Sequence, residues 1–123
     1  MIKLVYCIRR RADLTADAFR EYWLHHHAPL VAKHAAALQA RRYVQSHTID
    51  PETNALLRGS RSSGEPFDGI TEMWWDDTEA LASALGSDDG RRAGAELLED
   101  ERNFIDFARS SLFVSEEHAI FGD

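Results

Sequence analysis

Two hydrophobic periods alternate along the chain and predict its elements of secondary structure. Stretches rich in β-branched and aromatic residues, bounded by polar or glycine-containing segments, predict strands. Stretches with apolar residues three and four apart, opened by Ser, Thr or Asp, predict helices. The predicted strands are 2–9, 42–49, 67–75 and 111–121; the predicted helices are 15–27, 29–38, 79–85 and one that follows 87–89 and runs to about 100. A short helical turn or loop, 101–107, precedes the last strand.

The first predicted helix carries an aromatic stripe and meets a proline. Phe19, Tyr22 and Trp23 lie three and four residues apart, which indicates one face packed against an apolar surface. Pro29 has no amide hydrogen and restricts the preceding residue to extended geometry. We therefore expect the helix to end or kink near His27, with Pro29 starting a second helical piece.

The segment 50–66 has the composition of a connection between the second and third strands. It contains Asp-Pro, several serines and Gly-Glu-Pro, all typical of turns. We expect it to be long, mobile and without regular structure. Seventeen such residues are unusual in a compact domain, which indicates a lid or a binding loop.

The order of elements, βαββαβ, is that of a ferredoxin-like α+β fold with a four-stranded antiparallel sheet and the long helices on one face. The second and third strands carry bulky apolar residues on both of their faces. These residues are Tyr43, Val44, Ile49, Ile70, Met73, Trp74 and Trp75. One helical layer covers only one face, and a large exposed apolar patch usually marks an interface. We therefore expect a homodimer that pairs sheet against sheet; the alternative is a monomer whose aromatic side chains line an open cleft.

Length and composition narrow the class of protein. The 123 residues, of which 44% are hydrophobic, fit one compact domain over 1–123. No stretch approaches the roughly 20 apolar residues that span a bilayer, and the chain opens on a strand pattern, so we expect a cytoplasmic protein without a membrane partner. The net charge of −7 disfavours binding to nucleic acid, which requires clustered Lys and Arg. The single cysteine, Cys7, lies in a predicted strand and is expected to be a buried, inert thiol.

Three consecutive histidines, His25, His26 and His27, are the first candidates for chemistry. Neighbouring side chains on a helix point about 100° apart, so these three do not converge on one ion, and no metal site is expected. His27 shares the stripe of Phe19 and Trp23 and is the one placed to protrude into a cavity. An imidazole titrates near neutral pH, which suits a general acid or base. The alternative is a structural histidine that caps backbone groups at the kink.

Polar and aromatic side chains on the second and third strands supply partners for His27. Side chains two residues apart share one face of a strand. Two such sets are Tyr43, Gln45 and His47 on the second strand, and Asp68, Glu72 and Trp74 on the third. If both faces point away from the helices, they line a cavity between sheets that suits a small, partly apolar ligand with a carbonyl or phenol group. The alternative is that these side chains are exposed at the sheet edges.

The segment 19–31 resembles the hallmark of the EthD family. Its pattern is Phe-x-x-Tyr-Trp-x-x-x-His-Ala-Pro-Leu-Val, from Phe19 to Val31. Further similar segments are 2–5, 42–47, 67–74 and 100–106. The resemblance implies a dimeric ferredoxin-like α/β barrel. Related barrels include lactone isomerases, cyclases and decarboxylases of aromatic polyketides, and quinone-forming monooxygenases, most of which need no metal or organic cofactor. In the isomerase-like relatives, a histidine at the end of the first helix and a tyrosine on the second strand take part in proton transfer, and His27 and Tyr43 match these positions.

Three functions are open at this point. The first is a cofactor-independent lyase or isomerase, of dehydratase, decarboxylase or cyclase type, acting on a small aromatic or cyclic carbonyl compound. His27 would be the general base there, with Tyr43 or His47 orienting an enolate oxygen. The residues expected to contact the substrate are Tyr22, His47, Asp68, Glu72 and Trp74. The second is a non-enzymatic carrier or an accessory protein of an oxygenase, in which His27 is structural. The third is a cofactor-free monooxygenase, in which the pocket desolvates an enolate for reaction with oxygen.

Overall fold

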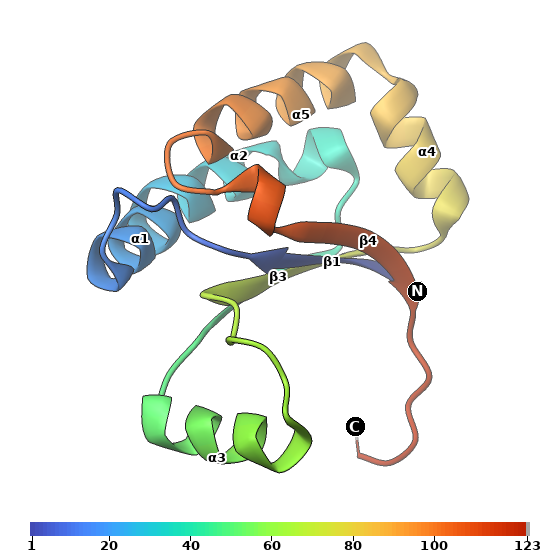
Figure 1. Cartoon of the computed structure of the whole chain (residues 1–123). Helices are drawn as coiled ribbons and strands as arrows, with labels where there is room; N and C mark the ends of the chain where they lie inside the picture. Colours follow the sequence, from blue (N-terminus) through green and yellow to red (C-terminus); the bar gives the residue numbers. More distant parts are fainter. Residues whose placement is uncertain (123) are drawn as a thin grey trace.

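A computed structural model describes residues 1–122 and contains one antiparallel sheet. Its strands are β1 (Ile2–Ile8), β2 (Arg42–His47), β3 (Gly69–Trp75) and β4 (Ser111–Glu116), in the spatial order β2-β3-β1-β4. β1 and β3, which lie in the middle, contain mostly apolar residues, whereas the edge strand β4 is largely exposed. The predicted α+β, ferredoxin-like arrangement is confirmed (Figure 1).

One face of the sheet is covered by helices. Three of these helices are capped at their N-termini by hydroxyl or carboxylate side chains. The covering elements are α1 (Ala16–Tyr22), the π-helical segment η1 (Trp23–His27), α2 (Ala28–Leu38), α4 (Thr78–Gly86) and α5 (Asp88–Glu101) (Figure 1). Thr15, Asp77 and Ser87 each accept a hydrogen bond from the amide three residues later, which caps α1, α4 and α5. A short 3-10 helix, η2 (Phe107–Arg109), leads into β4. None of the helices within residues 1–122 has the length and apolar character needed to cross a membrane.

The expected helix end at His27 is a widened turn. The amide of Ala28 donates to the carbonyl oxygen of Trp23, five residues earlier, and the chain passes directly into α2. Pro29 occupies the first turn of α2, where its missing amide hydrogen breaks no helical hydrogen bond. The proline therefore marks the position of the irregularity correctly, but the irregularity is a π-helical turn. Such turns inside α-helices are frequent at functional sites.

The segment 50–66 is mostly helical, so the expectation of a connection without regular structure is wrong. It contains α3 (Pro51–Arg61), which lies on the side of the sheet opposite to the other helices (Figure 1). Asp50 accepts a hydrogen bond from the amide of Thr53, and Pro51 takes the first helical position. Asp-Pro is favoured both in turns and at helix starts, and composition alone did not separate the two. Strands β2, β3 and β4 are also shorter than predicted, because their outer residues 48–49, 67–68 and 117–121 form no ladder pairs.

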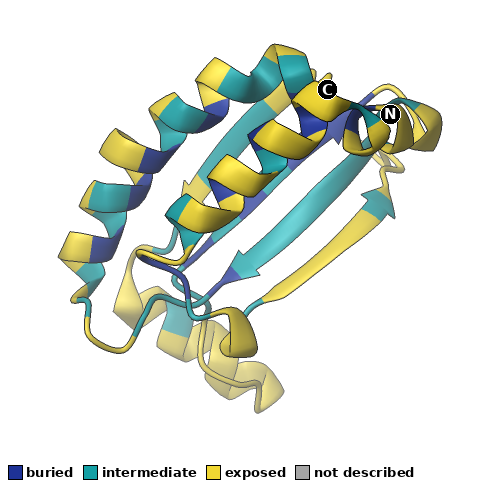
Figure 2. Cartoon of the chain, turned by 90° about the horizontal axis from the view of Figure 1, so that it is seen from above, coloured by how far each residue is buried: buried dark blue, intermediate teal, exposed yellow. Residues whose placement is uncertain are grey.

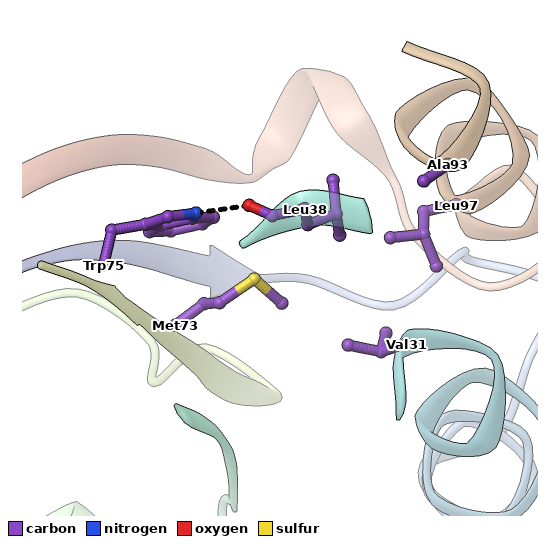
Figure 3. Packing of buried hydrophobic residues seen from close by; sticks show 6 residues of the cluster. All are labelled: Val31, Leu38, Met73, Trp75, Ala93 and Leu97. Carbon is purple, nitrogen blue, oxygen red and sulfur yellow. Dashed lines mark hydrogen bonds between the residues drawn. The ribbon is translucent and has the colours of Figure 1, made fainter. Parts of the chain in front are cut away.

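The apolar core divides into two clusters along the helical layer. The first consists of Val31, Leu38, Met73, Trp75, Ala93 and Leu97, and the indole N–H of Trp75 donates to the carbonyl oxygen of Leu38 at 2.7 Å (Figure 3). The second consists of Ile8, Phe19, Trp23, Phe104 and Ile105. The aromatic stripe predicted for the first helix thus packs in the second cluster, where Phe19 and Trp23 are fully buried. Figure 2 shows these buried positions on the inner sides of the helices and in the middle of the sheet.

Replacing Gly69 with Ala tests the packing of Trp23 on β3. A Cβ atom at this position would lie 2.4 Å from Cζ3 of Trp23 and 2.8 Å from the carbonyl oxygen of Ser46. Because the indole is buried and the strand is paired on both sides, we expect Gly69→Ala to lower the free energy of unfolding by about 1–3 kcal/mol. Urea denaturation followed by tryptophan fluorescence measures this loss. Gly59→Ala in α3, where a Cβ meets nothing within 4 Å, is the control and should be neutral or slightly stabilising; equal effects of both changes would contradict the packing.

Candidate active site

A cavity of about 440 Å³ lies between the helical layer and the sheet. Its walls include members of both core clusters and are mostly apolar. The side chains that bring polar atoms to it come from five elements: Tyr6, His27, Tyr43, Thr71 and Glu101. A few polar groups that converge in an otherwise apolar pocket are typical of a binding site for a small organic molecule.

His27 reaches this cavity from the end of the π-helical turn. Its Nδ1 lies 2.7 Å from Oδ2 of Asp100 on α5, and the two side chains are 8% and 17% exposed. Burial lowers the pKa of His27, and the hydrogen bond and negative charge of Asp100 partly oppose that shift. His27 is therefore largely neutral near pH 7, the state in which an imidazole accepts a proton.

The hydrogen bonds of Asp100 decide which ring nitrogen of His27 carries the hydrogen. Burial alone would raise the pKa of this carboxyl, but hydrogen bonds from Tyr22 and His27 outweigh it, and the pKa falls below its ordinary value. The Tyr22 hydroxyl donates to Oδ1 of Asp100 at 2.5 Å. An ionised carboxylate only accepts, so Nδ1 of His27 carries the hydrogen and Nε2 holds the free lone pair. This is the arrangement of a carboxylate–histidine general base.

A second hydrogen-bond chain positions Tyr43. The side-chain amide of Gln45 donates to the Tyr43 hydroxyl at 2.7 Å and to the carbonyl oxygen of Trp23 at 2.9 Å. Both of its hydrogens are then used, so its oxygen accepts from Nε2 of His47, 2.8 Å away. The Tyr43 oxygen accepts from Gln45, and the Thr71 hydroxyl also lies within its hydrogen-bonding reach. The Tyr43 hydroxyl has one hydrogen to donate. Burial raises the pKa of Tyr43, so the phenol stays protonated near neutral pH.

Tyr6 and Glu101 form a third polar group, which the sequence reasoning missed. Burial raises the pKa of Glu101 to about 7, with a further contribution from the negative charge of Asp100. Burial and the neighbouring Glu101 carboxyl raise the pKa of Tyr6. Glu101 follows Ala93 and Leu97 at intervals of four and so lies on the apolar stripe of α5. A carboxyl group on such a stripe could have been recognised from the sequence as a candidate site residue. Glu101 is the candidate here for a carboxyl group that exchanges protons near neutral pH.

The structure separates the residues that the sequence placed together. Tyr43, Gln45 and His47 lie on the helix-covered face, so the expectation that they share an inter-sheet cavity with the third-strand set is wrong. His47 does not line the cavity, but it contacts the cavity wall by stacking on Trp23, with ring centroids 4.3 Å apart, and through Gln45, which donates to Tyr43. Tyr22 lies outside the cavity and acts on it through Asp100.

The third-strand candidates are engaged in other contacts. Asp68 accepts hydrogen bonds from the backbone amide and the guanidinium of Arg10, at 2.8 and 2.6 Å. Glu72 pairs with Lys3 at 2.6 Å on the face of the sheet opposite to α1, α2, α4 and α5. The Trp74 ring lies on that same face, where it is covered by Arg42 and Lys3 and its indole N–H donates to Glu117.

The other two histidines of the triplet point away from the cavity. His25 is exposed beside Glu21, and His26 stacks on the Tyr22 ring with centroids 4.9 Å apart. Within residues 1–122, no three His, Cys, Asp or Glu side chains are grouped to hold a metal ion.

Comparison with known proteins identifies the family. The EthD domain pattern matches residues 11–108, which is most of the chain. This chain belongs to the EthD family. No curated protein sequence gives a significant match.

Solved structures agree with this membership. An ethyl tert-butyl ether D (EthD) family protein from Bacillus halodurans is 24% identical, with a TM-score of 0.64 over 96% of this chain and 99% of that chain. A dimeric ferredoxin-like protein of unknown function from Thermobifida fusca is 14% identical, with a TM-score of 0.57 over 93% and 88%. SnoaB, a cofactor-independent oxygenase from Streptomyces nogalater, is 13% identical, with a TM-score of 0.56 over 99% and 97%. At these identities the likeness shows the fold alone.

The buried Glu101 makes the stability of this EthD protein depend on pH. Its pKa rises from 4.5 to about 7 on folding, so the folded state holds a proton that the unfolded state releases between these values. The contribution of Glu101 to stability is therefore full below pH 4.5 and is lost as the pH rises through 7. We expect Glu101→Gln to remove this loss. The free energy of unfolding of the variant, minus that of wild type, should rise by up to about 3 kcal/mol between pH 4.5 and pH 8.

Urea unfolding of both proteins at several values between pH 4.5 and 8 measures the difference. Taking the difference cancels the contribution of His27, whose lowered pKa acts in the opposite direction. Glu99→Gln, which changes an exposed carboxylate two residues away on α5, is the control and should leave the pH profile unchanged. Parallel profiles for wild type and Glu101→Gln would show that Glu101 ionises normally.

Proposed function

We propose that this EthD protein is a proton-transfer enzyme of the lyase or isomerase type, acting on a small aromatic or cyclic compound with an enolisable carbonyl or phenol group. The observation that carries the proposal is the Asp100–His27 pair, which leaves an unprotonated imidazole nitrogen on a residue that lines a largely apolar cavity. A neutral base in such a cavity takes a proton from carbon, and Asp100 stabilises the imidazolium that forms.

Tyr43 and Trp23 supply the complementary donors. As a proton leaves carbon, negative charge develops on the carbonyl oxygen, and donors already in place stabilise it. The Tyr43 hydroxyl accepts from Gln45 and keeps its own hydrogen to donate. The buried indole N–H of Trp23 lies close enough to the Tyr43 hydroxyl to oppose the rise in pKa that burial causes, but it makes no hydrogen bond of normal geometry within residues 1–122. Neither group needs a cofactor for this role, which suits a cofactor-independent reaction.

A second candidate, a cofactor-free monooxygenase, begins with the same step. SnoaB, whose fold this chain shares, is described as a cofactor-independent oxygenase. An enolate or phenolate formed by His27 is the electron-rich species that reacts with oxygen in such enzymes. Oxygen consumption during turnover separates this candidate from the lyase or isomerase.

Replacing His27 with Gln tests proton abstraction. Hydrogen–deuterium exchange of 1-tetralone, 2-tetralone and cyclohexane-1,3-dione in D₂O reports removal of a proton next to a carbonyl. We expect wild type to accelerate exchange of at least one of these ketones, and His27→Gln to lower that rate by about 10²- to 10⁴-fold. Mass spectrometry and NMR measure the exchange.

His25→Gln is the matched control, because His25 is two residues away and exposed. It should keep the wild-type rate. Equal exchange rates for wild type and His27→Gln would contradict the proposal. Binding of these ketones without any catalysed exchange would favour a non-enzymatic carrier.

We also propose that the chain forms a homodimer through the face of the sheet opposite to α1, α2, α4 and α5, beside α3. The Thermobifida fusca protein that shares its fold is described as dimeric. Val5 points to this face because its neighbours Leu4 and Tyr6 line the cavity on the other side. Phe113 on the edge strand also borders the cavity, but it is paired with Val5, between Leu112 and Val114, so alternation directs its side chain to the same face as Val5. Val44 and Ile70 add apolar surface there, and Phe113 is 48% exposed. Apolar side chains on one sheet face are covered when a second copy packs against them.

Phe113→Lys tests this interface. A lysine ammonium at the centre of an apolar contact must be desolvated, so we expect the variant to run as a monomer where wild type runs as a dimer. Light scattering after size-exclusion chromatography measures the mass. Leu98→Lys on α5 is the control, because Leu98 is similarly exposed, at 45%, but lies on the helical side. A monomeric wild type, or a dimer that survives Phe113→Lys and not Leu98→Lys, would exclude this face.

A further inference from the structure

The walls of the cavity change from polar to apolar in one direction. Starting from His27, the helical chain continues to Val31 and Leu38, both apolar. On β3, Thr71 is followed by Met73 and Trp75 on the same face. The two elements thus present their polar groups at one end of the cavity and their apolar groups at the other.

β1 and α5 show the same change from polar to apolar side chains, although their chain direction is opposite to that of β3. In β1, Tyr6 pairs with Thr71 and Leu4 pairs with Met73, so the polar and apolar rows continue from β3 to β1. On β2, Tyr43 pairs with Met73, and its hydroxyl meets the side chain of Gln45, which pairs with Thr71 in the polar row. α5 brings Glu101 to the polar end and Leu97 and Gly94 to the apolar end. The cavity therefore has a polar zone, where His27 and Glu101 lie next to the cluster of Ile8, Trp23 and Ile105, and an apolar compartment on the side of Leu97 and Gly94.

The apolar compartment is long enough to hold a substituent. Gly94 and Glu101 are seven residues apart on one helix, which is roughly 10 Å along its axis. Gly94 lines the cavity, and a Cβ atom on it would meet nothing within 4 Å. Protein interiors seldom keep voids larger than a water molecule, so unfilled space of this size marks a place for a ligand.

The compartment opens to solvent between α4 and β4. Leu85 of α4 and Leu112 and Val114 of β4 line it and are 55%, 55% and 48% exposed. Figure 2 shows β4 as the outermost, exposed strand without a helix above it. An apolar rim at this opening lets an apolar group enter or extend outward.

We propose that the ligand of this cavity is an amphipathic small molecule, with an enolisable carbonyl or phenol head at His27 and an apolar tail that runs past Gly94 toward the opening between α4 and β4. The head group rests on the proposed function. The tail rests only on the shape and the apolar walls of the compartment, so the two parts can fail separately.

Binding of a homologous series tests the tail. The probes are phenol and 4-ethyl-, 4-butyl- and 4-hexylphenol, titrated against wild-type protein by calorimetry. Each methylene that enters an apolar compartment strengthens binding by roughly two- to fourfold. We expect this gain to continue through butyl at least in wild type. In Gly94→Leu, whose side chain fills the compartment, the gain should stop at a shorter tail while the Kd of phenol itself is unchanged.

Two matched variants control for effects of Gly94→Leu that do not arise from filling the compartment. Gly59→Leu places the same side chain in α3, away from the cavity, and should reproduce the wild-type series. Gly94→Ala adds only a methyl group and should give a smaller shift in the same direction, which serves if Gly94→Leu is unstable. A Kd that does not change with tail length in wild type, or a Gly94→Leu that weakens phenol as much as hexylphenol, would overturn the proposal. In His27→Gln, binding should still strengthen as the alkyl tail grows longer. Hydrogen–deuterium exchange therefore tests the proposed function, and the alkylphenol series tests the apolar compartment.

Discussion

The hydrogen bonds accepted by the Asp100 carboxylate hold the site together. One oxygen accepts from Tyr22 in α1 and the other faces Nδ1 of His27 in η1, while Asp100 itself belongs to α5. This single carboxylate therefore connects α5 to α1 and η1, which are far apart from it in sequence. It fixes the helical wall of the cavity relative to the sheet. Hydrogen bonds to an ionised acceptor are stronger than neutral ones, and removing either donor would leave buried charge less well satisfied. The orientation of the His27 ring depends on this contact.

Asp100 and Glu101 are neighbours in sequence with opposite electrostatic environments. On a helix their side chains diverge by about 100°, so Asp100 meets two donors while Glu101 enters the apolar cavity. The pKa of Asp100 falls and that of Glu101 rises to about 7. Two carboxyl groups with pKa values pushed apart supply one permanent anion and one group that exchanges protons near neutral pH. The first keeps His27 in its basic tautomer, and the second is available to the ligand.

Local patterns predicted the parts of this site that depend on local geometry. The spacing of Phe19 and Trp23, together with Pro29, placed His27 at an irregular turn on a buried stripe, and the structure has it there. Alternation along a strand gives only relative faces, so it did not reveal that Tyr43 faces the helices and Trp74 faces away. The pairing of His27 with Asp100 joins residues 73 apart and depends on how α5 packs on η1, which no local pattern contains.

The division of the core explains why the cavity exists. Phe19, Trp23 and Phe104 fill one end of the helical layer, and Leu38, Trp75 and Ala93 fill the other. Between them stand three polar groups: the indole N–H of Trp23, which has no partner of normal geometry within residues 1–122, the buried carboxyl of Glu101 beside Tyr6, and the imidazole of His27. A core shaped only for stability would close this gap with apolar side chains, since unfilled space and unsatisfied polar groups both lower stability. Unfilled space and polar groups therefore coincide in one place, and this coincidence is the physical basis for proposing that the cavity binds a ligand.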